Sequence, residues 1–185
     1  LNSIVEGLIR IAIFIAYIAA IGMVPDIRRV FAYHGAEHKA INALEAGQPL
    51  TPESVRRYTT AHTRCGTSFL LIVLVVSILL FAPFHFEQWS LRLLSRVILI
   101  PVVAGVSYEF LKFTANHQDN AIVRALTKPG LALQSLTTRE PDDKMLEVSI
   151  AALVNTLAAD GVLDKQDQEN TSEHAKVSIS EIVDA

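Results

Sequence analysis

Long apolar runs without charge are the feature that most restricts how this chain can fold. From Cys65 to Phe84, about twenty consecutive residues carry no charged side chain, and Leu, Ile, Val and Phe dominate them. A helix of about 20 such residues crosses the hydrocarbon core of a bilayer. The run therefore predicts a membrane helix that Pro83 closes, with Phe84, Phe86 and Trp89 as interfacial aromatic residues.

Two further runs resemble the first. Ile4 to Val24 is apolar apart from Glu6 and Arg10, which lie near its start, where an arginine can reach the interface. Val97 to Phe110 is the third run, and Leu91 to Arg96 forms its helical lead-in. We expect an all-α integral membrane protein with about three transmembrane helices, together with amphipathic helices at the cytoplasmic face or interface.

Basic residues predict the orientation of these spans. The connection between the first two spans holds Arg28, Arg29, Lys39, Arg56, Arg57 and Arg64, whereas the next connection holds Arg92 and Arg96. The positive-inside rule then places the first connection and the C-terminal segment in the cytoplasm. The predicted location is the plasma membrane, with the lipid bilayer as a partner.

The polar segments predict further helices. One helix is expected from Arg29 to Ala46 and another from Pro52 through His62, after a start at Thr51. We interpret Lys128-Pro129-Gly130 as a turn.

Glu140-Pro141-Asp142-Asp143 is typical of a helix N-terminus, and the helix after it carries an apolar stripe. Residues 1–159 are expected to form one helical membrane domain. The polar residues 160–185 are expected to form a mostly disordered tail.

The connection after the first span contains the most distinctive polar motif. In a helix, His34, Glu37 and His38 share one face, because they stand at i, i+3 and i+4. Two imidazoles one turn apart can chelate one metal ion, and the glutamate between them can act as a ligand or a general base. The alternative interpretation is a polar helix face that hydrogen-bonds to other protein groups.

A second group of residues that can bind metal precedes the second span. His62 and Cys65 are three residues apart, and imidazole with thiolate suits zinc. If they meet His34 and His38, the four would form a closed tetrahedral set. With Cys65 outside the shell, three histidines would leave a position open for water. Cys65 could equally be a small buried apolar residue.

Three other charged residues are candidates for supporting roles. Glu109 lies near the end of the third span, where a carboxylate is costly unless it is paired or reaches a polar site, so it could be an additional ligand. Glu45 and Arg64 could orient the ligands, and solvated surface roles are the alternative for both.

Composition restricts the remaining function classes. The formal net charge of −3 gives no reason to expect nucleic acid as a partner, and one cysteine excludes an internal disulfide framework. The sequence leaves a homo-oligomer open.

Several stretches carry a family resemblance. They are Pro25 to Phe31, Tyr33 to Ala43, Arg64 to Leu70, Pro101 to Glu109 and Leu136 to Asp143. On these stretches the chain resembles the YqhQ-like family of bacterial membrane proteins of unknown function, described as predicted metal-dependent enzymes. The resemblance implies a protein of the bacterial inner membrane, with an additional N-terminal portion in most members.

Two main functions follow from these expectations, and a third, metal transport, is disfavoured because only Glu109 offers a charged ligand within a span. The first is a zinc-type hydrolase acting on a membrane-borne or lipid-like substrate, with His34, His38 and His62 as ligands and Glu37 activating water. The second is a non-catalytic membrane assembly or scaffold factor with a structural metal or polar site.

Overall fold

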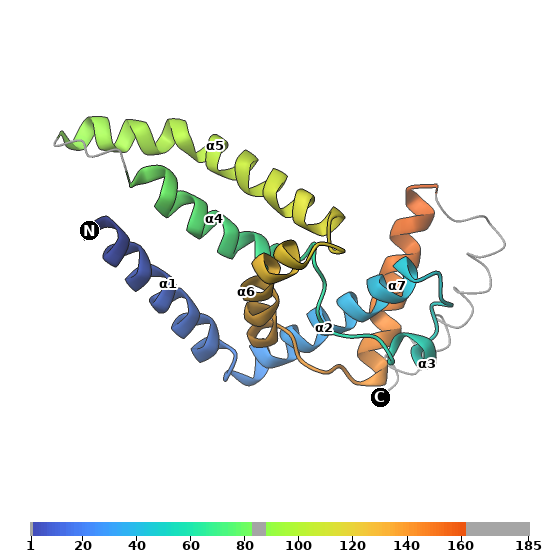
Figure 1. Ribbon diagram of the computed structural model, residues 1–185. Helices are drawn as coiled ribbons and strands as arrows, with labels where there is room; N and C mark the ends of the chain where they lie inside the picture. The colour runs from blue at the N-terminus through green and yellow to red at the C-terminus, as the bar shows by residue number, and fades with distance from the viewer. Residues whose placement is uncertain (1, 83–87, 162–185) are drawn as a thin grey trace. The chain divides into compact units, whose positions relative to one another are not determined.

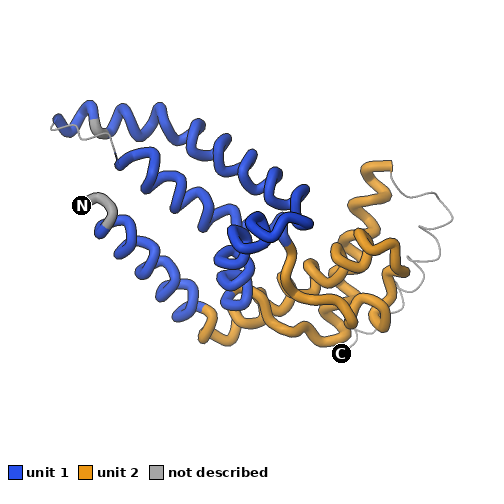
Figure 2. Tube along the Cα trace, in the orientation of Figure 1, with its two compact units in different colours: residues 1–21, 63–136 blue, residues 22–62, 137–185 orange. Residues whose placement is uncertain are grey.

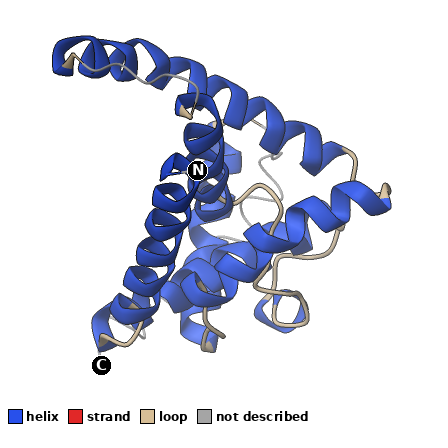
Figure 3. Ribbon diagram, turned by 60° about the vertical axis from the view of Figure 1, so that its left-hand side comes forward, coloured by secondary structure: helices blue, strands red, loops and turns tan. Residues whose placement is uncertain are grey.

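The computed structural model describes residues 2–82 and 88–161, and within them every regular element is a helix (Figure 3). The order along the chain is α1 (Asn2–Ile21), α2 (Pro25–Glu45), α3 (Pro52–Val55), α4 (Gly66–Phe81), α5 (Trp89–Asn116), α6 (Ala121–Thr137) and α7 (Asp143–Ala159). The expected all-α class is thus confirmed. The helices form two compact units, residues 1–21 with 63–136 and residues 22–62 with 137–185 (Figure 2).

The first unit contains α1, α4, α5 and α6. In it α4 packs against both α1 and α5, most extensively against α5 (Figure 1). α5 begins near the predicted lead-in and continues past Phe110 to Asn116, with Pro101 inside it. Many of its large apolar side chains are exposed, among them Ile98 (61%) and Ile100 (60%).

By length and composition, one described helix, α5, could cross a membrane, or two could if α1 and α2 count as one broken span. A buried helix of a soluble protein or a signal sequence can meet the same criteria. The run from Cys65 folds as α4, which has 16 residues. The end of that run at Pro83 and Phe84, and Phe86 with it, lie outside the described residues.

The predicted turn at Lys128-Pro129-Gly130 is wrong, because α6 continues through it. Proline removes one backbone donor, a loss that packing in this unit outweighs. Gln134 donates from Nε2 to Ser68 Oγ at 2.6 Å, and both residues are buried. Gly130 also lies against Ser68, since a Cβ added there would stand 3.0 Å from the hydroxyl oxygen.

The second unit is formed by α2, α3 and α7. Its core places the small side chains Ala36, Ala40 and Ala43 of α2 against Leu146 and its neighbours on α7. Small residues on one helix allow a close approach of the other, so the larger aliphatic side chains of α7 fill the space. The prediction that the apolar stripe of α7 packs against another apolar surface is therefore confirmed.

Local signals predicted where α3 and α7 begin. Asp142 caps α7 by accepting from Met145 N at 2.9 Å, as the acidic start predicted. Thr51 likewise accepts from Ser54 N at the start of α3. The predicted continuation of this helix to His62 is wrong, since it ends at Val55 and is followed by a loop. The predicted tail beyond residue 161 lies outside the described residues.

Candidate metal centre

The loop after α3 is held on α2 by a buried lysine. Lys39 Nζ donates to the carbonyl oxygens of Arg56 (3.0 Å) and Tyr58 (2.7 Å), and it forms an ion pair with Glu140 at 3.0 Å. These three acceptors match the three hydrogens of an ammonium group. The lysine is 4% exposed, so its charge is stabilised by these partners rather than by water.

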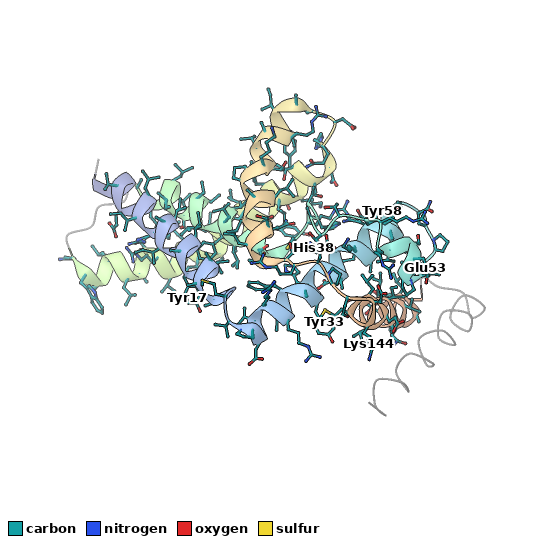
Figure 4. All side chains as sticks on the ribbon, turned by 90° about the horizontal axis from the view of Figure 1, so that it is seen from below. Tyr17, Tyr33, His38, Glu53, Tyr58 and Lys144 are labelled. Carbon is teal, nitrogen blue, oxygen red and sulfur yellow. The ribbon has the colours of Figure 1, made fainter. Side chains whose placement is uncertain are left out.

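Two more side chains of α2 bind the same loop. The Asn42 amide donates to the carbonyl oxygens of Thr59 (2.9 Å) and Ala61 (3.0 Å). His38 Nδ1 lies 2.6 Å from the intervening carbonyl oxygen, that of Thr60. Carbonyls that bind side chains of α2 do not take part in a continuing helix, which explains why α3 is short. Figure 4 labels His38 on α2 and Tyr58 on this loop.

The loop before α7 is bound to the same helix. His34 Nδ1 lies 2.9 Å from the carbonyl oxygen of Thr137, and Arg139 N donates to Phe31 O at 2.9 Å. Gly35 permits this approach, because a Cβ there would stand 2.2 Å from the Arg139 carbonyl oxygen. The glycine inside the His34–His38 motif is therefore required by packing.

The hydrogen bonds of His34 and His38 define their tautomers. A carbonyl oxygen can only accept, so Nδ1 of each ring carries the hydrogen and the neutral ring has its lone pair at Nε2. Metal-binding histidines usually bond a carbonyl or carboxylate through their other nitrogen in this way. The two ring centroids are 4.3 Å apart. This helix face thus hydrogen-bonds to other protein groups, as the alternative interpretation expected, and the same bonds leave the histidines oriented as metal ligands usually are.

His62 lies in the loop before α4, so the predicted helical setting for it is wrong. It is nevertheless buried, and its ring centroid is 5.8 Å from that of His38. Its Nε2 stands 3.4 Å from Glu45 Oε2, a carboxylate at the end of α2. A carboxylate in this position orients an imidazole.

Cys65 is buried and caps the N-terminus of α4, where Thr67 N donates to its sulfur at 3.4 Å. The N–H groups of the first turn of a helix favour negative charge nearby. The ligand atoms of His34, His38 and Cys65 all lie within 4.8 Å of one another, so this group could hold a metal ion. Cys65 follows His62 by three residues, which limits their Cα separation to about 11 Å.

The other candidate residues are not members of this group. Glu37 is exposed and, with His34, lines an open groove of about 610 Å³ along α2 and α7. Glu109 is exposed on α5 in the first unit, and Arg64 is exposed just before α4. Their roles as base, additional ligand and orienting group stay predictions.

The sequence analysis missed what Gly35, Lys39 and Asn42 do. A sequence signal was present for Gly35 and Lys39. They share one helix face with Ala32 and Ala36, at positions i, i+3, i+4 and i+7, so the lysine lies on a face of small residues. A stripe of small residues is typical of a tightly packed helix face. A lysine on it is therefore expected to be buried and fully bonded.

Comparison with known proteins gives a family without an activity. Residues 1–159 match the model of DUF1385, a protein family of unknown function. Over 164 residues the chain is 41% identical to the uncharacterized protein YqhQ of Bacillus subtilis strain 168, covering 89% of this chain and 51% of the relative. The chain thus spans about half the length of that relative. No solved structure matches.

The family is described only as one of unknown function and the relative only as uncharacterized, so neither supports a membrane location or a metal-dependent activity. The resemblance noted in the sequence is confirmed at the level of the family: the chain belongs to the DUF1385 family and is a homologue of YqhQ.

Proposed function

We propose that the protein is a membrane-bound, metal-dependent hydrolase in which His34, His38 and Cys65 bind a divalent metal ion. The observation that carries the proposal is the grouping of their ligand atoms within 4.8 Å. Carbonyl bonds at Nδ1 place the lone pairs of both imidazoles at Nε2, where a metal would be bound. Two imidazoles with one thiolate favour zinc among the common divalent ions.

Hydrolysis is the reaction class that this donor set supports best. Three protein ligands are typical of catalytic zinc sites, where the metal lowers the pKa of a bound water. Glu37 is suited to be the general base, because it is exposed and lines the same groove as His34. Ile41, Val148 and Leu153 make the groove largely apolar. An acyl chain or another lipid-like group is therefore the substrate class that it suits.

Exposed apolar helices support the membrane part of the proposal. Within α5, the most apolar 18-residue window is 12% buried, whereas the core helix of a soluble protein is mostly buried. On α1, Leu8 (61%) and Ile13 (63%) are exposed as well. Soluble proteins rarely expose large apolar surfaces, and lipid would cover these. Three spans, a cytoplasmic second unit and a bacterial inner-membrane location belong to this proposal.

A structural metal site is the second candidate. His62 favours it, because its ring is buried and its centroid is 5.8 Å from that of His38. A fourth protein ligand would close the tetrahedron and exclude water. The metal would then stabilise the loop that Lys39 and Asn42 also bind, and the protein would act as an assembly or scaffold factor.

Metal content of the purified chain tests both candidates. We expect about one zinc per chain after loading in lipid nanodiscs, and loss of the metal in His34→Ala, His38→Ala and Cys65→Ser. His117→Ala is the matched control, because this histidine also bonds a carbonyl oxygen (Phe113 O, 2.8 Å) but lies at the end of α5. No bound metal in the wild-type chain, or equal loss in the control, contradicts the proposal.

X-ray absorption then separates the two candidates. Coordination by two nitrogens, one sulfur and one oxygen supports the enzyme. In that case Glu37→Gln should still bind the metal but should no longer hydrolyse ester or amide lipids. Coordination by three nitrogens and one sulfur, with metal loss in His62→Ala, supports the structural site instead.

A further inference from the structure

Three arginines surround a hollow near the start of α2. Pro25, Arg28, Arg29 and Ala32 line it from the helix, at i, i+3, i+4 and i+7 of a single face. The loop before α7 provides the opposite wall. The hollow measures about 480 Å³, within the range of ligand sites.

The loop wall consists of Arg139 and Glu140, and hydrogen bonds hold it in place. Arg139 N donates to Phe31 O at 2.9 Å, and the guanidinium donates from Nη1 to Thr138 O at 2.9 Å. Glu140 forms an ion pair with Lys39 at 3.0 Å. The two walls therefore belong to one packed unit, in which backbone and ion-pair contacts hold the loop near α2.

The balance of charge in the hollow is strongly positive. Lys39 neutralises Glu140, the carboxylate in the lining, while Arg28 and Arg29 add two guanidinium groups from α2 and Arg139 a third from the loop. Within the described part of the chain, Arg28 and Arg29 have no acidic side chain within 4.0 Å, unlike Arg56, which pairs with Asp143. Like charges placed together repel, and an anion between them would remove that cost.

We propose that this hollow binds a phosphate group. Guanidinium groups match the geometry of phosphate oxygens and form paired charge-assisted hydrogen bonds with them. The start of α2 adds a favourable dipole, and Val24 at its N-cap contributes no capping hydrogen bond from its side chain. The site uses none of the three proposed metal ligands. Its ligand is either a phospholipid head group or a free phosphate compound.

Binding measurements on the full chain in detergent test this site. Native mass spectrometry would compare phosphatidylglycerol with diacylglycerol of the same acyl chains, and calorimetry would measure inorganic phosphate. Arg28→Gln with Arg29→Gln should weaken binding about tenfold or more, because each lost charge-assisted bond has a large effect. Arg57→Gln with Lys144→Gln removes the same charge from exposed positions of the same unit and should change binding little.

Each result supports or overturns the site. A selective loss with phosphatidylglycerol alone identifies a lipid head group, and a selective loss with inorganic phosphate as well identifies a general phosphate site. Absence of binding in the wild-type chain, or equal losses in both double variants, overturns the proposal. Circular dichroism should show the same melting temperature for both variants, so that unfolding does not explain the loss.

Discussion

Replacing Gly35 by alanine is the sharpest test of how the second unit is packed. The added Cβ would lie 2.2 Å from the Arg139 carbonyl oxygen, and ordinary contact begins at 3.4 Å, so the loop must retreat by about 1.2 Å. This movement would break the bond from Arg139 N to Phe31 O and strain that of His34 with Thr137 O.

The expected cost follows from these contacts. Overpacking costs about 1–3 kcal/mol, and each lost hydrogen bond costs about 1 kcal/mol. The higher helix propensity of alanine offsets about 1 kcal/mol. The second unit should therefore lose about 2–4 kcal/mol of unfolding free energy. For a chain of this size the melting temperature should fall by roughly 5–15 °C.

Gly105→Ala is the matched control, since nothing lies within 4 Å of a Cβ at that position of α5. It should be neutral or stabilising by about 1 kcal/mol. Thermal unfolding by circular dichroism measures both variants, and hydrogen exchange should show faster exchange in residues 137–142 for Gly35→Ala. Equal melting temperatures for the two variants would refute the packing argument.

Three other substitutions test the same unit. Lys39→Met should lower the free energy of unfolding by about 3–5 kcal/mol in thermal or denaturant unfolding, because it leaves Glu140 and two carbonyl oxygens without their donor. Lys144→Met, at an exposed position, should have little effect, and similar losses for the two variants would contradict this reasoning. Leu146→Ala should cost about 2–5 kcal/mol by the same measurement, because Leu146 is fully buried, and Val148→Ala, which is 37% exposed, should cost much less. Asn42→Ala should release the loop before His62 and thereby weaken zinc binding about tenfold in a competition titration. Unchanged zinc affinity despite faster hydrogen exchange in this loop would show that the loop does not support the metal ligands.

Signals carried by neighbouring residues were readable from the sequence. The helix start at Glu140 to Asp143 and the apolar stripe of α7 depend on positions within one or two turns, and both predictions were confirmed. The i, i+4 spacing of His34 and His38 likewise placed both imidazoles on one helix face. These features need no knowledge of distant parts of the chain.

Features that depend on distant partners were not readable. α3 ends early because side chains of α2 bind the carbonyl oxygens of residues 56 and 58–61, which are 17 to 22 positions away in sequence. α6 continues through Pro129 because Gly130 and Gln134 pack on Ser68. A turn signal at Pro-Gly is local, and tertiary packing overrode it.

The segment from His34 to Asn42 presents a different partner on each of its faces. One face packs on α7, a second binds the loop after α3, a third binds the loop before α7, and Glu37 faces the open groove. Because α2 organises the whole unit, most substitutions in this segment will change stability as well as any chemistry. Glu37 is the exception, because it is exposed and has no ion pair within the described residues. Loss of hydrolysis in Glu37→Gln with an unchanged melting temperature would therefore report on the reaction itself, a separation that substitution of either histidine does not offer.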